Sequence, residues 1–191
     1  MYVVAFNGSP RPGGNTARMI REVFGALEAE GVRTEMISLA GKRLPGCTAC
    51  GDCIQTKDGR CSIEGDALNE YVEKMVRADG IILGSPTYFS DVTAEMKALI
   101  DRAGFVVRVS GDLLRRKVGA AVVVARRAGT THAFDTMNHF FLISQMMVCG
   151  SSYWNMGIGL AEGDVDKDDE AMETMRTLGQ NMAWLLKKLR G

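Results

Sequence analysis

Hydrophobic positions along this 191-residue chain follow two different spacings, which alternate from one end to the other. Five short strand-like runs predict strands at residues 2–6, 33–39, 80–83, 118–125 and, more weakly, 151–155; residues 33–39 show alternation and 118–125 are the most apolar. Between them, longer stretches repeat apolar residues every three or four positions. These stretches predict five helices, at residues 17–30, 66–78, 94–107, 132–148 and 170–189.

Five alternations of strand and helix are typical of a parallel sheet whose two faces are both covered by helices. The run at 118–125 is the most apolar, as expected for a strand buried on both sides. We therefore predict an α/β three-layer sandwich with a five-stranded parallel sheet. Because no repeat or linker divides the chain, residues 1–191 are predicted to form a single domain, with a cysteine-rich insertion at 40–65.

The charge balance excludes some classes of partner. The chain has 23 Lys and Arg residues and 23 Asp and Glu residues, so its formal net charge is zero. A protein that binds nucleic acid mainly through phosphates needs an excess of positive charge, and so does one drawn to an anionic membrane. No stretch has the roughly 18 apolar residues of a membrane span. Residues 2–6 read as a strand and not as a signal peptide, so we predict a cytoplasmic protein.

A glycine-rich loop, GSPRPGGNT at residues 8–16, joins the first predicted strand to the first helix. A helix N-terminus suits a phosphate, because it offers free N–H groups and the positive end of the helix dipole. The loop is not a Walker A motif, and Pro10 breaks the dinucleotide-binding fingerprint. A plain strand-to-helix turn remains the alternative. The candidate phosphate-binding residues are Ser9, Arg11, Gly14, Asn15 and Thr16.

A second loop, at residues 84–91, follows the third predicted strand. Pro86 fixes its backbone, and Tyr88 and Phe89 place aromatic rings where a strand ends. In a sheet of order 2-1-3-4-5 the first and third strands flank the crevice in which ligands bind. This loop would then face the glycine-rich loop and offer aromatic surface to a flat ring. Alternatively, the two aromatic residues only cover the next helix.

The motifs GSPR…GNT at 8–16 and GSPTY at 84–88 resemble those of the flavodoxin-like NADPH-dependent FMN reductases. The resemblance implies a flavodoxin-like fold, bound FMN, NAD(P)H as a possible electron donor, and a homodimer or homotetramer. It implies that Ser9, Arg11, Asn15 and Thr16 contact the phosphate. It implies a third ligand loop at 126–131, closest to the flavin at Gly129. The residues it implies along the flavin ring are Pro86, Thr87, Tyr88, Phe89 and Ser90.

Four of the five cysteines lie in the insertion. Cys47, Cys50 and Cys53 form a C-x2-C-x2-C run, and Cys61 follows after seven residues. Ferredoxin-type loops bind 4Fe–4S clusters with this spacing, whereas zinc sites usually separate two cysteine pairs by a dozen residues or more. The position of the loop resembles that in the iron–sulfur flavoproteins, which implies these four residues as ligands. Zinc or thiols without metal remain alternatives, and Cys149 is expected to be a buried apolar residue.

These features together predict an FMN-dependent electron-transfer oxidoreductase that couples the flavin to a 4Fe–4S cluster. Because the flavin carries the chemistry, no catalytic acid or base is expected. One alternative is an NAD(P)H-dependent FMN or quinone reductase in which the cysteines bind zinc or nothing. Another is a non-catalytic redox-sensing protein. The expected partner is a small-molecule or protein redox partner, and neither nucleic acid nor a membrane.

Overall fold

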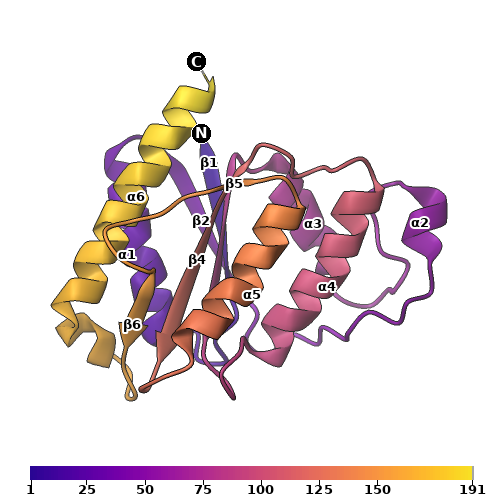
Figure 1. Cartoon of the computed structure of the whole chain (residues 1–191). Helices are drawn as coiled ribbons and strands as arrows, with labels where there is room; N and C mark the ends of the chain where they lie inside the picture. Colours follow the sequence, from indigo (N-terminus) through magenta and orange to yellow (C-terminus); the bar gives the residue numbers. More distant parts are fainter. Residues whose placement is uncertain (191) are drawn as a thin grey trace.

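The computed structural model describes residues 1–190. A parallel sheet in the order β2-β1-β3-β4-β5, with β6 also pairing with β4, lies between two layers of helices (Figure 1). The strands are β1 (Tyr2–Asn7), β2 (Arg33–Ser38), β3 (Gly80–Pro86), β4 (Val118–Ala125), β5 (Met147–Val148) and β6 (Met156–Ile158). The helices are α1 (Asn15–Ala29), α2 (Asp52–Thr56), α3 (Leu68–Arg77), α4 (Ala94–Val109), α5 (Thr130–Ile143), the 3-10 helix η1 (Asp164–Lys167) and α6 (Asp169–Arg190).

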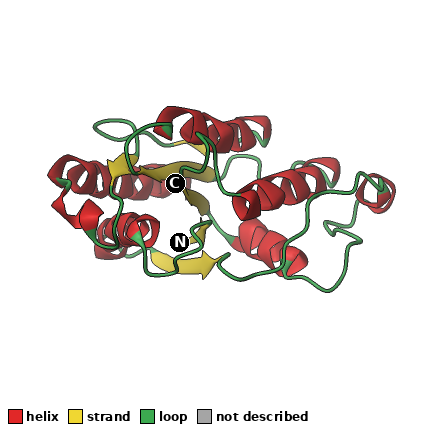
Figure 2. Ribbon diagram, turned by 90° about the horizontal axis from the view of Figure 1, so that it is seen from below, coloured by secondary structure: helices red, strands yellow, loops and turns green. Residues whose placement is uncertain are grey.

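The strand order and the two helical layers confirm the predicted flavodoxin-like α/β fold. Seen from below, the strands separate one group of helices from the other (Figure 2). Helices α1 and α6 pack together on one face, while α3, α4 and α5 cover the other. The carboxyl ends of β1, β3 and β4 point the same way, so the loops that follow them meet at one edge of the sheet.

Side chains along β4 point alternately to the two faces of the sheet, which explains why this strand is so apolar. Val123 packs into the core beneath α5, whereas Val122 and Val124 pack into the core beneath α1 and α6. Successive side chains of a strand point to opposite faces, so a strand with helices on both sides needs apolar residues at every position. Every residue of β4 is buried, which agrees with the predicted central position.

The predicted fifth strand at 151–155 is wrong. The edge position beyond β4 is divided between β5, which pairs with the start of β4, and β6, which pairs with its end. Residues 151–155 form the excursion between these two short strands, where the Ser151 hydroxyl donates to Asn155 Oδ1 at 2.5 Å. The predicted helix at 132–148 is too long, because α5 ends at Ile143 and Gln145 turns the backbone to a positive φ of 56°.

Other boundaries shift less. Helix α1 begins at Asn15 rather than at residue 17, and β3 extends to Pro86. The short helix α2 within the cysteine-rich insertion was not predicted. In Figures 1 and 2 it lies on the outer side of α4, away from the sheet. Among residues 1–190, no helix is both long enough and apolar enough to cross a membrane.

Candidate functional site

The glycine-rich loop curls tightly before α1. Gly14 N–H donates to the carbonyl oxygen of Arg11 at 3.0 Å, and Ser9 Oγ accepts from Arg11 N–H at 3.1 Å. A Cβ on Gly14 would lie 3.0 Å from Arg11 Cβ, so glycine avoids a close contact in the turn. Among the described residues no side chain caps the first turn of α1. Its N–H groups are therefore free to bind an anion, as the sequence predicts.

The side chain of Asn15 also has partners within the chain that the sequence did not indicate. Its Nδ2 donates to the carbonyl oxygen of Ala161 at 2.8 Å, and its Oδ1 accepts from Gly163 N–H at 2.8 Å. Gly159 also approaches, because a Cβ there would lie 2.6 Å from Asn15 Nδ2. Asn15 therefore fastens the segment at 159–163 to the start of α1. Arg11 contacts the same segment through Leu160, whose carbonyl oxygen accepts from Nη1 at 3.3 Å.

The second loop ends in a tight turn. Tyr88 and Asp91 exchange two backbone hydrogen bonds of 2.8 and 3.0 Å, and the two residues between them have positive φ angles, 49° at Phe89 and 66° at Ser90. Such conformations cost of order 1 kcal/mol or more for residues other than glycine. The Phe89 side chain is fully exposed, and Tyr88 is half exposed. The turn thus holds two aromatic rings at the rim of the sheet.

Thr93, which was not predicted, connects the two loops. Its hydroxyl donates to the carbonyl oxygen of Gly8 at 2.8 Å, and its backbone N–H donates to Ser85 Oγ at 3.1 Å. Thr93 also caps α4, because its Oγ1 accepts from Met96 N–H at 3.3 Å. A threonine just before a predicted helix is a sequence signal for a helix cap. Nothing in the sequence indicates its hydrogen bond to a residue 85 positions away.

These loops enclose a cleft of about 160 Å3 at the carboxyl edge of the sheet. The predicted residues that line it are Ser9, Arg11, Gly14, Asn15, Thr16, Pro86, Thr87 and Tyr88. Arg126, from the implied third ligand loop, and Pro10, from the glycine-rich loop, also line it. The lining residues that the sequence did not indicate are Val124, Ala125, Gly159 and Leu160. Thr87 Oγ1 is buried and has no hydrogen-bond partner within residues 1–190. A buried hydroxyl without a partner in a cleft fits a ligand that supplies one.

Phe89, Ser90 and Gly129 are not among the described residues that line this cleft. Gly129 precedes α5 with a φ of 89°, and a Cβ there would lie 2.8 Å from Ser90 Cα and 2.9 Å from Thr87 Cγ2. The close approach expected at Gly129 is therefore made to the 87–90 turn. Its role in the structure is to let the third loop support the second.

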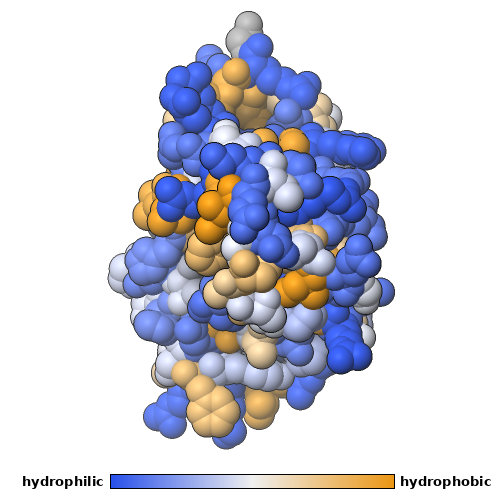
Figure 3. Space-filling model, turned by 90° about the vertical axis from the view of Figure 1, so that its right-hand side faces the viewer, coloured by the Kyte–Doolittle hydropathy of each residue, from blue (hydrophilic) through white to orange (hydrophobic). Residues whose placement is uncertain are grey.

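The four cysteines of the insertion line one cavity of about 110 Å3. Its walls include the apolar side chains of Ile54, Phe105 and Val106. Burial, followed by the charges of the other three thiols, raises the pKa of Cys53. The molecular face that carries α2 and α4 is largely hydrophilic, with several small apolar patches (Figure 3).

Two of these cysteines, Cys50 and Cys61, form hydrogen bonds with neighbouring side chains. Cys50 Sγ lies 3.4 Å from the Ser62 hydroxyl, and this hydrogen bond lowers the pKa of Cys50. The backbone of Cys61 is held on both sides by the amide of Asn69, through bonds of 2.8 and 3.0 Å. Cys149 lies apart from this site and is buried, as expected, and burial raises its pKa to about 11.

The four thiols line a cavity, and within the described residues they are not grouped around a single metal-ion position. Four sulfur ligands at about 2.3 Å from one zinc ion would lie about 3.8 Å from each other. Within residues 1–190, no group of three or more His, Cys, Asp or Glu side chains is placed to hold a metal ion. Four cysteine side chains that line one apolar cavity fit a group with several attachment points, such as an iron–sulfur cluster.

Comparison with known proteins shows which family the chain resembles. Residues 1–161 match the model of the family described as NADPH-dependent FMN reductase. An iron-sulfur flavoprotein of Methanocaldococcus jannaschii is 43% identical, with both chains covered completely. One of Archaeoglobus fulgidus is 30% identical, with 99% of each chain covered. The solved NAD(P)H:quinone oxidoreductase from Methanothermobacter marburgensis has a TM-score of 0.71 at 16% identity, covering 95% of this chain and 96% of that one, which shows a shared fold.

Proposed function

Because the chain belongs to the NADPH-dependent FMN reductase family, we propose that this oxidoreductase couples FMN in the cleft to a 4Fe–4S cluster on the insertion. The observation that carries the proposal is the cavity lined by Cys47, Cys50, Cys53 and Cys61. These are the four cysteines with ferredoxin-type spacing, and the same chain has a cleft lined by most of the candidate FMN-binding residues. Relatives described as iron-sulfur flavoproteins, at up to 43% identity, support both cofactors.

The cleft residues would bind FMN by complementary chemistry. The free N–H groups at the start of α1 and the charge of Arg11 suit the phosphate. The unpartnered hydroxyl of Thr87 suits a polar edge of the ring, and Tyr88 offers it an aromatic surface. Bound FMN would supply chemistry in which two electrons arrive as a hydride and leave singly, to a cluster that takes one. The protein's part is to hold both groups and control access to them.

Access to the cleft is open at the second loop. Tyr88 and Phe89 are exposed at its rim, where a flat electron donor or a redox partner could approach. We propose NAD(P)H as the donor, on the basis of the family, and a small molecule or a protein as the acceptor. Exposed Leu142 and Ile143 on α5 and Met147 on β5 support the proposed self-association, because such apolar side chains favour an interface.

A reductive titration without oxygen tests the coupling. The purified wild-type protein should take up about three electrons per FMN, two for the flavin and one for the cluster. Cys50→Ala should retain FMN but take up about two, because it removes one cluster ligand. Cys149→Ala is the matched control, since that cysteine lies outside the cavity, and should behave as wild type. Uptake of two electrons by all three proteins would contradict the proposal and favour a reductase without a cluster.

A further inference from the structure

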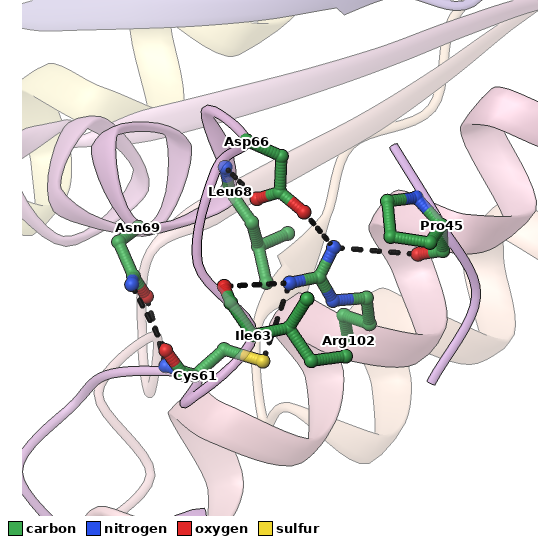
Figure 4. Close-up of polar contacts among 7 residues, drawn as sticks. All are labelled: Pro45, Cys61, Ile63, Asp66, Leu68, Asn69 and Arg102. Atoms are coloured by element: carbon green, nitrogen blue, oxygen red, sulfur yellow. Dashed lines mark hydrogen bonds and ion pairs between the residues drawn. The ribbon is translucent and has the colours of Figure 1, made fainter. Parts of the chain in front are cut away.

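A fully buried arginine lies against the cysteine loop. Arg102, in the middle of α4, is 1% exposed and is the largest fully buried side chain among the described residues. Its guanidinium donates to Asp66 Oδ2 at 2.5 Å and to Cys61 Sγ at 3.3 Å (Figure 4). It also donates to the carbonyl oxygens of Pro45 at 3.3 Å and of Ile63 at 3.4 Å. Arginine is almost never buried this deeply unless it is paired.

Part of this network is explained by loop architecture. Pro45 precedes the first cysteine of the motif, whereas Ile63 and Asp66 follow the last, so Arg102 joins the two ends of the insertion to α4. An anchor of this kind needs only oxygen acceptors. The bond to the sulfur of Cys61 goes beyond what anchoring requires. Arg102 Nε is also buried and has no partner among residues 1–190. The oxygen acceptors of the loop therefore do not satisfy every donor of the guanidinium.

The position of the charge relative to the cavity is the second observation. Among the described residues that line the cavity of the four thiols, Arg102 is the one with a permanent charge. In Figure 4 its guanidinium lies between the sulfur of Cys61 and the carboxylate of Asp66. Asp66 is therefore farther from the sulfur than the positive charge is, and its other oxygen accepts from Leu68 N–H at 2.9 Å. The pair is neutral in total but presents its positive end to Cys61.

We propose that Arg102 is a positioning and tuning residue for the cluster, which its bond to Cys61 makes easier to reduce, while Asp66 limits the effect. This inference rests on the proposed function, because it needs a cluster at the four cysteines. Reduction adds one negative charge to a site of thiolate ligands. A buried N–H donor with a positive charge at one ligand sulfur stabilises the reduced form more than the oxidised form. The low exposure of both Arg102 and Asp66 keeps water from screening this interaction.

The two members of the pair should act with opposite sign on the midpoint potential of the cluster. Arg102→Met removes the donor and the positive charge at nearly constant volume, so its potential should fall. At a fixed solution potential, the ratio of reduced to oxidised cluster should drop at least tenfold, which is about 59 mV for a one-electron couple. Asp66→Asn keeps Arg102 and removes the opposing charge, so its potential should rise. Arg102→Lys retains a charge without the planar fork and should lie between wild type and Arg102→Met.

The measurement is a redox titration of the holoprotein followed by the paramagnetic resonance signal of the reduced cluster. Arg108→Met is the matched control, because it removes an exposed arginine from the same helix that does not line the cavity. Its potential should equal that of wild type. If Arg102 only anchored the loop, Arg102→Met and Asp66→Asn would both lose iron, and their cluster potentials would not shift in opposite directions. This result would overturn the inference.

Arg102→Met leaves the Asp66 carboxylate buried without its partner, which is strongly destabilising. The double variant Arg102→Met/Asp66→Asn removes both charges and keeps the test open if the single variant does not fold. Its potential should still lie below wild type, since the bond to Cys61 is lost, and an unchanged potential would overturn the inference. If wild-type protein holds no iron, the proposed function fails as well. If wild type holds the cluster and Arg102→Met has the same potential, only the inference fails.

Discussion

The hydroxyl of Thr93 donates a hydrogen bond of 2.8 Å to the carbonyl oxygen of Gly8, and this bond joins the two loops of the candidate FMN cleft. Both atoms are buried in the interior behind the cleft. Gly8 also has no room for a side chain, because a Cβ would lie 3.0 Å from Thr93 Oγ1 and from Met96 Cβ. The threonine at the start of α4 therefore helps to set the spacing of the two loops, together with the bond of 2.8 Å from Gly8 N–H to the carbonyl oxygen of Gly84.

Replacing Thr93 should weaken FMN binding. Thr93→Val keeps the shape but leaves the carbonyl oxygen of Gly8 without this donor, at a cost of about 1–3 kcal/mol. We expect the dissociation constant for FMN to rise about tenfold, which corresponds to about 1.4 kcal/mol. The quenching of FMN fluorescence on binding measures it. Thr93→Ser retains the hydroxyl and should bind as wild type does. Equal affinities of the valine and serine variants would contradict the role of this bond.

Asn15 should matter to stability more than its position in a phosphate loop suggests. Asn15→Ala removes the bonds to Ala161 and Gly163, each of which contributes about 1 kcal/mol. The free energy of unfolding of the apoprotein in urea should therefore fall by about 2 kcal/mol. If Asn15 served only the phosphate, the apoprotein would be as stable as wild type, and only the stabilisation by added FMN would decrease.

Gly129 is predicted to support the aromatic turn. Gly129→Ala forces a side chain into a positive φ and against Ser90 and Thr87, and it should destabilise the protein by about 1–3 kcal/mol. Gly111→Ala is the control, because its φ is also positive, at 98°, but nothing lies within 4 Å of the added Cβ. Thermal unfolding should detect both changes. Only Gly129→Ala should also weaken FMN binding, and an equal loss in both variants would refute the supporting role.

Thiol reactivity should separate Cys149 from the four cysteines of the insertion. After iron is removed with a chelator, Cys47 and Cys50 are exposed and should react rapidly with a disulfide reagent at pH 8. Cys149 should react last, because it is buried and its pKa is raised to about 11. At pH values below that pKa, its thiolate fraction grows tenfold for each unit by which the pH is raised. Its rate of reaction with the reagent should therefore increase toward pH 11. Mass spectrometry of quenched samples identifies the order, and early labelling of Cys149 would contradict its burial.

The sequence predicted the centre of the sheet better than its edge. Strands β1, β3 and β4 are largely apolar runs of six to eight residues, and β2 is a six-residue strand in which side chains alternate, so local spacing is enough to find them. Strands β5 and β6 have two and three residues. The apolar residues Met146–Val148 continue the pattern of α5, and nothing local shows that the backbone turns at Gln145. Only pairing with β4 makes these segments strands.

The same limit applies to the site. The candidate phosphate loop and the cysteine loop are each contiguous in sequence, so their motifs predict where they lie. The contacts of Asn15 with Gly163, Thr93 with Gly8 and Arg102 with Cys61 span 148, 85 and 41 positions. A single sequence read by local spacing contains no signal for such pairs. They follow from the way the parallel sheet and its covering helices bring distant segments together.

The central claim is that one chain holds FMN and a 4Fe–4S cluster on the cysteine loop. Iron and acid-labile sulfide per FMN, measured on protein purified without oxygen, test it most directly. We predict about four iron atoms and about four sulfides per FMN in wild type, and a loss of both in Cys50→Ala with FMN retained. Stoichiometric FMN with neither iron nor sulfide in the wild-type protein would contradict the account.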